Sequence, residues 1–141
     1  MPVRFYVDAD LLGVAKVLVT VRSDVTYPGD EGGVGPDGRS RPPCPIRPGD
    51  KDPVWIPQVA GSGWVIISRD RHMRNRPAEQ AAILEHRARV VVLDAHRELS
   101  KWGQLEIIVC QWRGIEELHG LPGPWVYVAS RGGLRRQRLV R

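Results

Sequence analysis

Lysine and cysteine are both scarce in this 141-residue sequence. Only three of its 21 basic residues are lysines, and the rest are arginines. The two cysteines, Cys44 and Cys110, lie far apart and match no CxxC metal or redox motif. This spacing argues against a cysteine-based zinc module or a dithiol redox centre, and it leaves a disulfide between the two residues open.

Long hydrophobic runs are absent as well. No apolar run reaches the length that crosses a bilayer, and the first residues show no signal-peptide pattern. We therefore expect a soluble, cytoplasmic protein without a membrane contact. Three motifs of common enzyme classes are also missing: the phosphate loop GxxxxGK[ST], the zinc motif HExxH and the nucleophile elbow GxSxG.

The composition that remains is that of a globular, basic protein. Hydrophobic residues make up 42% of the chain, which is enough for a core in one domain of this length. The formal net charge is +5 and the isoelectric point is about 9.8, and a basic surface favours polyanions such as RNA. The excess of arginine is equally typical of a GC-rich genome, so the charge alone does not decide between these interpretations.

Apolar runs alternate with helical patterns along the chain. This alternation predicts an α/β fold with a mostly parallel sheet. We expect one domain over residues 1–130, with a Gly- and Pro-rich loop insertion at 28–51 and a basic tail at 131–141. The strands are expected at 3–7, 24–27, 64–68, 90–94 and 125–130, and the helices at 11–21, 52–63, 77–88 and 99–112.

Acidic residues stand where the expected strands end. Asp8, Asp70 and Asp94 each follow an apolar run, and Asp52 opens a helix that leads into the strand before Asp70. Because such sheets bind ligands beyond the carboxyl ends of their strands, we expect the carboxylates of Asp8 and Asp70 to converge. Converging carboxylates repel one another unless a cation lies between them. Oxygen ligands select Mg²⁺ or Mn²⁺, and these ions activate water for phosphodiester cleavage without a Ser, Cys or His nucleophile.

Some of these acids also have an ordinary structural interpretation. Asp52 stands directly before a proline and could be the N-cap of its helix. Asp10 could cap the helix that follows it, and so could Asp94. A carboxylate at the end of a buried strand needs a partner, so Asp8 is the strongest candidate for a functional acid.

The segments FYVDADL and DPVWIPQVAGSGWVIISRD, in this order within residues 3–94, resemble the PIN-like nucleases. This broad group includes the VapC-type toxins of bacterial toxin–antitoxin pairs. Its first strand ends in an Asp, which Asp8 matches. A later Asp begins a helix, matched by Asp52, and that helix leads into a strand ending T-x-D. Ser68 to Asp70 match this last motif, with Ser in place of Thr.

The resemblance implies a three-layer, PIN-like α/β sandwich in which helices flank a mostly parallel central sheet. It also implies an Mg²⁺ or Mn²⁺ site and endoribonuclease activity, with Asp8, Asp52 and Asp70 as catalytic metal ligands and Asp10 as a further acid at the metal. A cognate antitoxin protein that blocks the site is the partner that the resemblance implies.

One acid of the group has no counterpart here. Larger VapC-like proteins carry a Glu on a helix between the first Asp and the helix-opening Asp. The Gly- and Pro-rich segment occupies that place in this chain. Asp30 and Glu31 are the acids in it that could reach back to the site, and Asp10 is the third candidate for a replacement.

The segment RDRHMRNR adds positive charge next to the expected site. A phosphate backbone that approaches a carboxylate cluster needs cations nearby. We therefore predict RNA contacts for this segment, with an ordinary solvated loop as the alternative. The predicted contact residues are Arg69, Arg71, Arg74 and Arg76.

Three hypotheses for the function follow from these residues. The first is a metal-dependent endoribonuclease that acts as a toxin and could form a homodimer through an apolar stripe from Leu99 to Trp112. The second is a PIN-like module that binds RNA or protein without catalysis, in keeping with the missing Glu. The third is a phosphate-accepting domain of the response-regulator type, which ranks last because no Lys follows Asp70 before Lys101.

Overall fold

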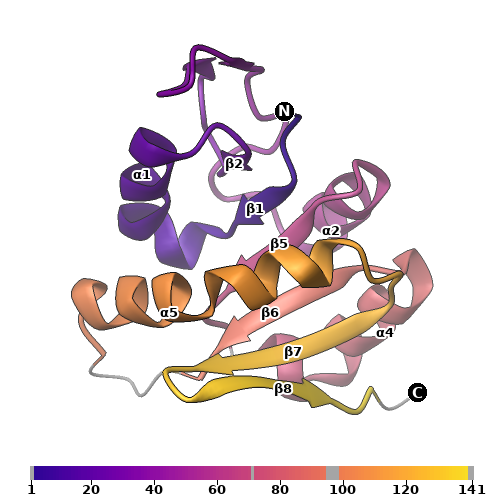
Figure 1. Cartoon of the computed structure of the whole chain (residues 1–141). Helices are drawn as coiled ribbons and strands as arrows, with labels where there is room; N and C mark the ends of the chain where they lie inside the picture. Colours follow the sequence, from indigo (N-terminus) through magenta and orange to yellow (C-terminus); the bar gives the residue numbers. More distant parts are fainter. Residues whose placement is uncertain (1, 71, 95–98, 140–141) are drawn as a thin grey trace.

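The structure is a computed structural model that describes residues 2–70, 72–94 and 99–139, and a six-stranded sheet lies at its centre (Figure 1). The strand order is β2-β1-β5-β6-β7-β8. All neighbouring pairs are parallel except β7 with β8. The strands are β1 Phe5–Val7, β2 Val25–Thr26, β5 Val65–Ser68, β6 Arg89–Leu93, β7 Trp125–Ser130 and β8 Gly133–Gln137.

Helices cover both faces of this sheet. The buried residues form two clusters, one beneath α1 and α5 and the other beneath α2, α3 and α4, and Figure 1 shows α5 lying across β6 and β7. The predicted three-layer sandwich with a mostly parallel sheet is therefore confirmed. The helices are α1 Leu12–Val21, α2 Asp52–Gly61, α3 His72–Asn75, α4 Pro77–His86 and α5 Lys101–His119, and the 3₁₀ helix η1 spans Ala9–Leu11.

The central strands are apolar throughout because both of their faces are covered. In β5, Val65 and Ile67 contribute to the cluster beneath α1 and α5, whereas Ile66 contributes to the opposite cluster. All three side chains are fully buried. Runs without polar alternation are what a parallel sheet between two helical layers requires, and this rigid support fixes where each strand ends.

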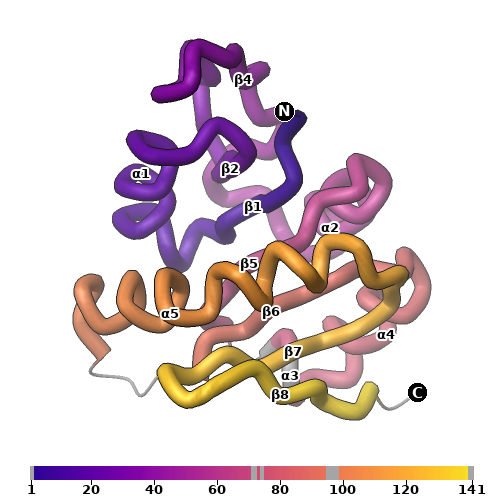
Figure 2. Tube along the Cα trace, in the orientation of Figure 1, coloured from indigo at the N-terminus to yellow at the C-terminus, as the bar shows by residue number. Residues whose placement is uncertain are grey.

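The Gly- and Pro-rich insertion has a defined structure. It contains the antiparallel hairpin of β3 Gly33–Val34 and β4 Ser40–Arg41, seen at the top of Figure 2. The carboxylate of Asp30 accepts two hydrogen bonds from Arg41, at 2.6 and 2.8 Å, and a third from the hydroxyl of Thr26 in β2. Because Asp30 and Arg41 are both buried, this pair anchors the insertion to the edge of the sheet.

The segment expected to be a basic tail contributes a strand. Residues 133–137 form β8, which pairs antiparallel with β7 and is the outer strand of the sheet. Leu134 packs against the core cluster beneath α5. Leu134 thus anchors this arginine-rich segment to the core, a contact that the basic composition of the segment does not indicate.

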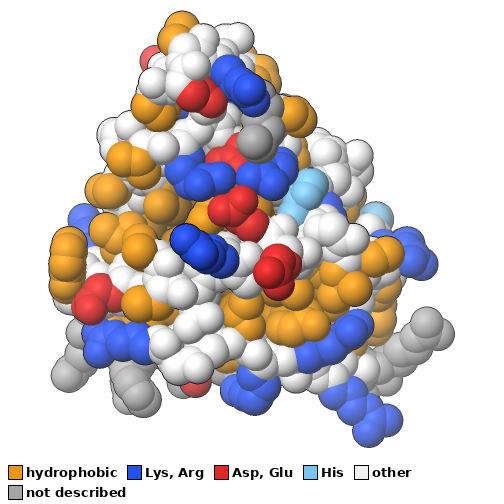
Figure 3. Space-filling model, viewed as in Figure 1, with side chains coloured by type: hydrophobic (Ala, Val, Ile, Leu, Met, Phe, Trp, Pro, Cys, Tyr) orange, Lys and Arg blue, Asp and Glu red, His pale blue; other side chains and the backbone are white. Residues whose placement is uncertain are grey.

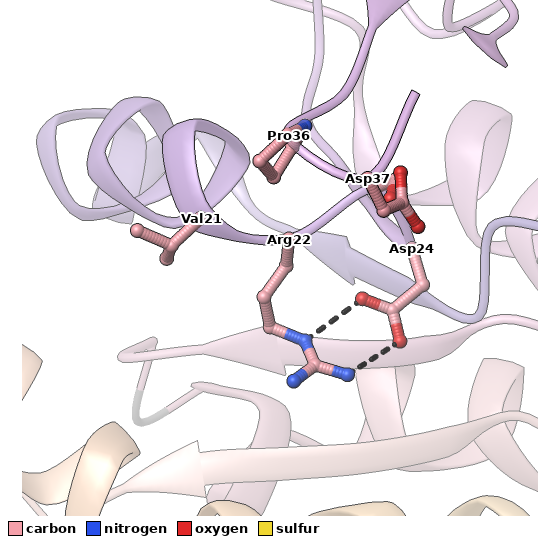
Figure 4. Close-up of a pocket in the computed structure, with 6 residues that line it drawn as sticks. Val21, Arg22, Asp24, Pro36 and Asp37 are labelled. Atoms are coloured by element: carbon pink, nitrogen blue, oxygen red, sulfur yellow. Dashed lines mark hydrogen bonds and ion pairs between the residues drawn. The ribbon is translucent and has the colours of Figure 1, made fainter. Parts of the chain in front are cut away.

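A second ion cluster lies at the amino-terminal edge of the sheet. The buried carboxylate of Asp24 accepts hydrogen bonds from Arg4 and Arg22, and both arginines also approach Glu116 of α5. Arg22 and Asp24 line a pocket of about 160 Å³ (Figure 4). Since the basic and acidic groups neutralise one another, we interpret this cluster as a link between β1, β2 and α5.

The face that carries α5 has no continuous basic surface. Figure 3 shows basic and acidic side chains side by side near its centre, with hydrophobic side chains around them. A polyanion would therefore find mixed charge on this face.

Both cysteines are free thiols. Among residues 2–70, 72–94 and 99–139, no helix is long and apolar enough to cross a membrane.

Replacing Asp30 by Asn should destabilise the protein, because Arg41 would keep its charge in a buried place without its partner. Breaking a buried ion pair from one side costs about 3–5 kcal/mol of unfolding free energy. Urea denaturation of Asp30→Asn measures this loss. The control is Glu31→Gln, which removes the neighbouring exposed charge and should change stability by no more than about 0.5 kcal/mol. Equal stability of the two variants would contradict an anchoring role for Asp30.

Candidate functional site

The candidate site lies at the carboxyl edge of the sheet, where β1 and β5 end side by side. Asp8 directly follows β1, and its backbone N–H donates to the carbonyl of Ile67 in β5 at 2.9 Å. Ser68 is the last residue of β5. The helix α2 directly precedes β5 and runs antiparallel to the parallel strands. Its first residue, Asp52, therefore lies at the same edge of the sheet.

The hydroxyl of Ser68 is the meeting point of the site. Its oxygen lies 3.3 Å from Oδ2 of Asp8 and 3.2 Å from Oδ2 of Asp10. The same oxygen accepts a hydrogen bond of 3.0 Å from the backbone N–H of Asp70. A hydroxyl has a single hydrogen, so Ser68 can donate to only one of the two carboxylates at a time.

Asp8 and Asp10 accept hydrogen bonds from different backbone N–H groups, and Asp8, not Asp10, is a helix N-cap. Asp8 is the N-cap of η1, and its Oδ1 accepts a hydrogen bond of 2.7 Å from the N–H of Ala9. Asp10 lies inside η1, and its Oδ1 accepts a bond of 3.4 Å from the N–H of Arg69. The interpretation of Asp10 as a helix cap is therefore wrong. The chain turns tightly after β1, which leaves Asp8 in the capping position and directs Asp10 to β5.

Asp52 is also not the N-cap that its position before Pro53 suggests. Lys51 is the N-cap of α2 and makes no capping bond through its side chain, so Asp52 is the first helical residue. Its Oδ1 accepts a hydrogen bond of 3.0 Å from the indole Nε1 of Trp55, one turn further along the helix. The carboxylate is thereby tied to a core residue.

Electrostatic effects link these acids. Burial raises the pKa of Asp8 to about 7, and the charge of Asp10 and then that of Asp52 add to this effect. The hydrogen bonds from Ala9 and Ser68 lower the pKa but do not cancel the increase. Burial also raises the pKa of Asp10, and the charge of Asp70 adds to this, against the bonds from Arg69 and Ser68. Asp10 and Asp52 thus act on Asp8, and Asp70 acts on Asp10, and repulsion of this kind between like charges is costly.

The donors at this edge suit a hard divalent cation. Asp8, Asp10, Asp52 and Asp70 offer only oxygen, the ligand that Mg²⁺ and Mn²⁺ prefer, and burial together with the negative charges of Asp10 and Asp52 raises the pKa of Asp8. Within the part of the chain that the structure describes, however, no three His, Cys, Asp or Glu side chains are grouped closely enough to hold a metal as they stand. The chemistry of the donor set fits the ion, and the side chains are not gathered around one point.

Asp30 does not supply the acid that has no counterpart in this chain. Asp30 is 2% exposed and lies within the ion pair with Arg41. Burial alone would raise its pKa, but the bonds from Arg41, Gly32 and Thr26 bring the pKa below its usual value. Asp30 therefore belongs to the fold. Glu31 is exposed, and Asp10 is the one of the three candidates that the structure places beside Asp8.

The predicted RNA-contacting arginines follow β5. Arg69 is partly buried at the end of that strand, and Arg76 is exposed at the N-cap of α4. Arg74 lies in α3, and Arg71 is outside the described residues. Their roles in RNA contact remain predictions.

Two residues of the site have signals that sequence reasoning used for other purposes. Ser68 is predicted only to replace a motif Thr, whereas its hydroxyl donates to Asp8 or Asp10 and accepts a hydrogen bond from the backbone N–H of Asp70. Trp55 is expected to be a core residue, and it is buried. Its spacing of three residues from Asp52 on a helix is the signal that could have revealed their contact.

Acids gathered at the carboxyl edge of a parallel sheet, with helices on both faces, define the class to which this site belongs. A family model described as a PIN like domain matches residues 4–95, which is more than half of the chain and includes all four acids. The chain therefore belongs to the PIN-like domain family. PIN domains are generally nucleases that act on nucleic acids, and they typically use divalent metals. No curated protein and no solved structure matches the chain.

Replacing Asp8 by Asn should stabilise the metal-free protein at pH 8. The pKa of the Asp8 carboxyl rises from 3.8 in the unfolded chain to about 7 in the folded protein. The folded protein therefore becomes less stable as the pH increases from about 4 through 7, because in this range the carboxyl ionises more readily in the unfolded state. Asn carries no charge and is itself a good N-cap. We expect a gain of about 1–3 kcal/mol at pH 8 and a smaller one at pH 5, after allowance for partial exposure.

Thermal and urea unfolding in EDTA at the two pH values measure this effect. Glu31→Gln is the control, since it removes one negative charge from an exposed position in the insertion. An equal dependence of stability on pH in wild type and Asp8→Asn would show that Asp8 is not held in a repulsive environment.

Proposed function

We propose that this protein is an Mg²⁺- or Mn²⁺-dependent endoribonuclease that acts as the toxin of a type II toxin–antitoxin module. The observation that carries the proposal is the arrangement around Ser68, which brings Asp8, Asp10 and the backbone of Asp70 to one hydroxyl in a PIN-like chain. Asp8, Asp52 and Asp70 are the proposed ligands of the ion. Asp10 supports them as an acid further from it.

The chemistry that such an ion supplies is the activation of water and the neutralisation of charge on the scissile phosphate. The residues of this chain provide the place for it. β1 and β5 aim Asp8 and Asp70 at the same edge, and α2 brings Asp52 to it from the adjoining layer. The hydroxyl of Ser68 is within hydrogen-bond distance of the carboxylates of both Asp8 and Asp10.

The arginines after β5 are the proposed phosphate-binding residues. Arg69 precedes the short helix α3, next to Asp70 in the sequence, and Arg76 directly follows that helix. A phosphate chain that approaches several acids needs compensating positive charge. The face with α5 carries mixed charge (Figure 3), and this supports an RNA path along the carboxyl edge.

The biological setting of the proposal comes from the resemblance to VapC-type toxins. It includes a cognate antitoxin that covers the carboxylate site, and a cytoplasmic location in which the RNA substrate is found. A homodimer is part of the same proposal. It is supported by two exposed hydrophobic side chains one heptad apart on α5, Trp102 and Val109.

Replacement of Asp8 by Asn should abolish RNA cleavage while the protein stays folded. Loss of residues that merely support metal ligands costs about 10–100-fold in activity, so removal of a ligand should lower the cleavage rate by more than about 100-fold. The assay uses purified wild type and Asp8→Asn with a mixed RNA substrate in Mg²⁺, Mn²⁺ or EDTA. Wild-type cleavage should vanish in EDTA and return when either ion is added.

The matched control is Asp37→Asn, an exposed acid at the opposite edge of the sheet that lines the pocket of Figure 4. This variant should cleave like wild type. Unchanged cleavage by Asp8→Asn would contradict the proposed site. Tight RNA binding by wild type without cleavage in either metal would instead identify a PIN-like binding module that lacks catalysis.

Arg76 should contribute to RNA binding through charge alone. In an Asp8→Asn background, which separates binding from cleavage, Arg76→Ala should weaken binding to RNAs of any sequence. The slope of log affinity against log salt should fall by about 0.7, the value of one single-strand phosphate contact. Fluorescence anisotropy at several salt concentrations measures it. Arg39→Ala, an exposed arginine of the insertion, should leave the slope unchanged, and an equal effect of the two variants would exclude a local contact by Arg76.

A further inference from the structure

Trp55 contributes a polar group to the site from within the core. Its side chain is 2% exposed, yet Nε1 donates a hydrogen bond of 3.0 Å to Oδ1 of Asp52. A buried indole needs an acceptor, and in this chain Trp125 finds one in the backbone carbonyl of Leu121. For Trp55 the acceptor is a carboxylate of the candidate site instead.

The ring of Trp55 is itself held by the strand that carries Asp8. Its centroid lies 5.2 Å from that of Tyr6, with 31° between the two ring planes. Tyr6 is 1% exposed and belongs to β1, two residues before Asp8. Asp52 is thus connected to the strand that precedes Asp8 by a hydrogen bond to Trp55 and by the packing of Trp55 on Tyr6.

This connection gives the Asp52 side chain a hydrogen-bond donor that is itself held in the core. Asp52 is the first residue of α2, and its N-cap Lys51 makes no side-chain bond there. The indole N–H supplies a donor with a fixed direction, because the ring on which it stands is buried on β1.

We propose that Trp55 is a positioning residue, which orients the Asp52 carboxylate at the carboxyl edge and thereby sets the affinity of the site for a divalent cation. The second half of this inference rests on the proposed function. Bonds of this kind to ligating carboxylates change metal affinity by about 10–100-fold when they are removed. A residue that only fills the core would affect stability without such a change.

The variant Trp55→Phe separates the two roles, since Phe keeps an aromatic ring against Tyr6 and lacks the N–H. Trp64→Phe is the matched control. Trp64 also stacks on Tyr6, at 6.5 Å between centroids and 8° between planes, and the described bonds of the four acids do not include its indole. The same substitution at the two positions therefore differs in the bond to Asp52.

Calorimetric titration with Mn²⁺ on the full chain is the first measurement. We expect Trp55→Phe to bind Mn²⁺ about 10–100-fold more weakly than wild type, with RNA cleavage restored towards the wild-type rate at saturating Mn²⁺. Trp64→Phe should bind Mn²⁺ like wild type. Wild-type Mn²⁺ affinity in a folded Trp55→Phe would overturn the proposal, as would an equal loss in both variants.

The second measurement needs no metal. In nitrogen-15 spectra of the metal-free protein, the indole signal of Trp55 is the one that Trp55→Phe removes. In Asp52→Ala this signal should shift and exchange faster with water, while the signal of Trp125 stays in place. An unchanged Trp55 signal would overturn the orienting contact.

The two measurements keep this inference distinct from the proposed function. If wild type neither binds Mn²⁺ nor cleaves RNA, the proposed function fails and the cation half of the inference fails with it. The indole signal then decides the orienting half by itself. If Trp55→Phe does not fold, the comparison of wild type with Asp52→Ala still gives that decision, because it leaves Trp55 in place.

Discussion

Repulsion among carboxylates at one edge of the sheet is the constraint on which the rest of this structure depends. Asp8 and Asp10 share a single hydroxyl, and Asp52 and Asp70 act on them through space. Holding like charges together requires a support that cannot relax. Two strands covered on both faces provide it, because their fully buried side chains prevent β1 and β5 from separating. The apolar strands are therefore part of the site as well as of the core.

Several arginines of this chain pair with acids that hold the fold together. Asp24 and Asp30 hold together parts of the fold, and each is bonded by buried or partly buried guanidinium groups. The hydrogen bonds described for Asp8 and Asp10 come from a hydroxyl and from backbone N–H groups, which carry no charge. The structural acids Asp24 and Asp30 are thus neutralised within the fold, whereas the positive charge described near Asp10, that of Arg69, acts on it through space. A divalent cation at this edge is part of the proposed function.

The sequence was sufficient for the layers and for the place of the acids, because both follow from patterns within short segments. Apolar runs with Asp at their ends predict strands and the edge at which they stop. The N-caps were not predictable in this way: Asp8 caps η1, Leu11 is the N-cap of α1 and Lys51 that of α2, so that Asp10 and Asp52 lie within helical turns. The pairing of Asp30 with Arg41 and the strand β8 depend on partners distant in sequence, which periodicity does not reveal.

The way in which the insertion is fastened determines where this protein can be modified. Its base is tied down through Asp30, Arg41 and the buried side chain of Ile46. The tip between β3 and β4 is exposed and includes Gly38 at φ +80°, while Pro36 and Asp37 on the same tip line the pocket with Arg22 and Asp24. An affinity tag or a fluorescent group introduced at that tip would stand away from the carboxyl edge, and it would leave both ends of the chain free.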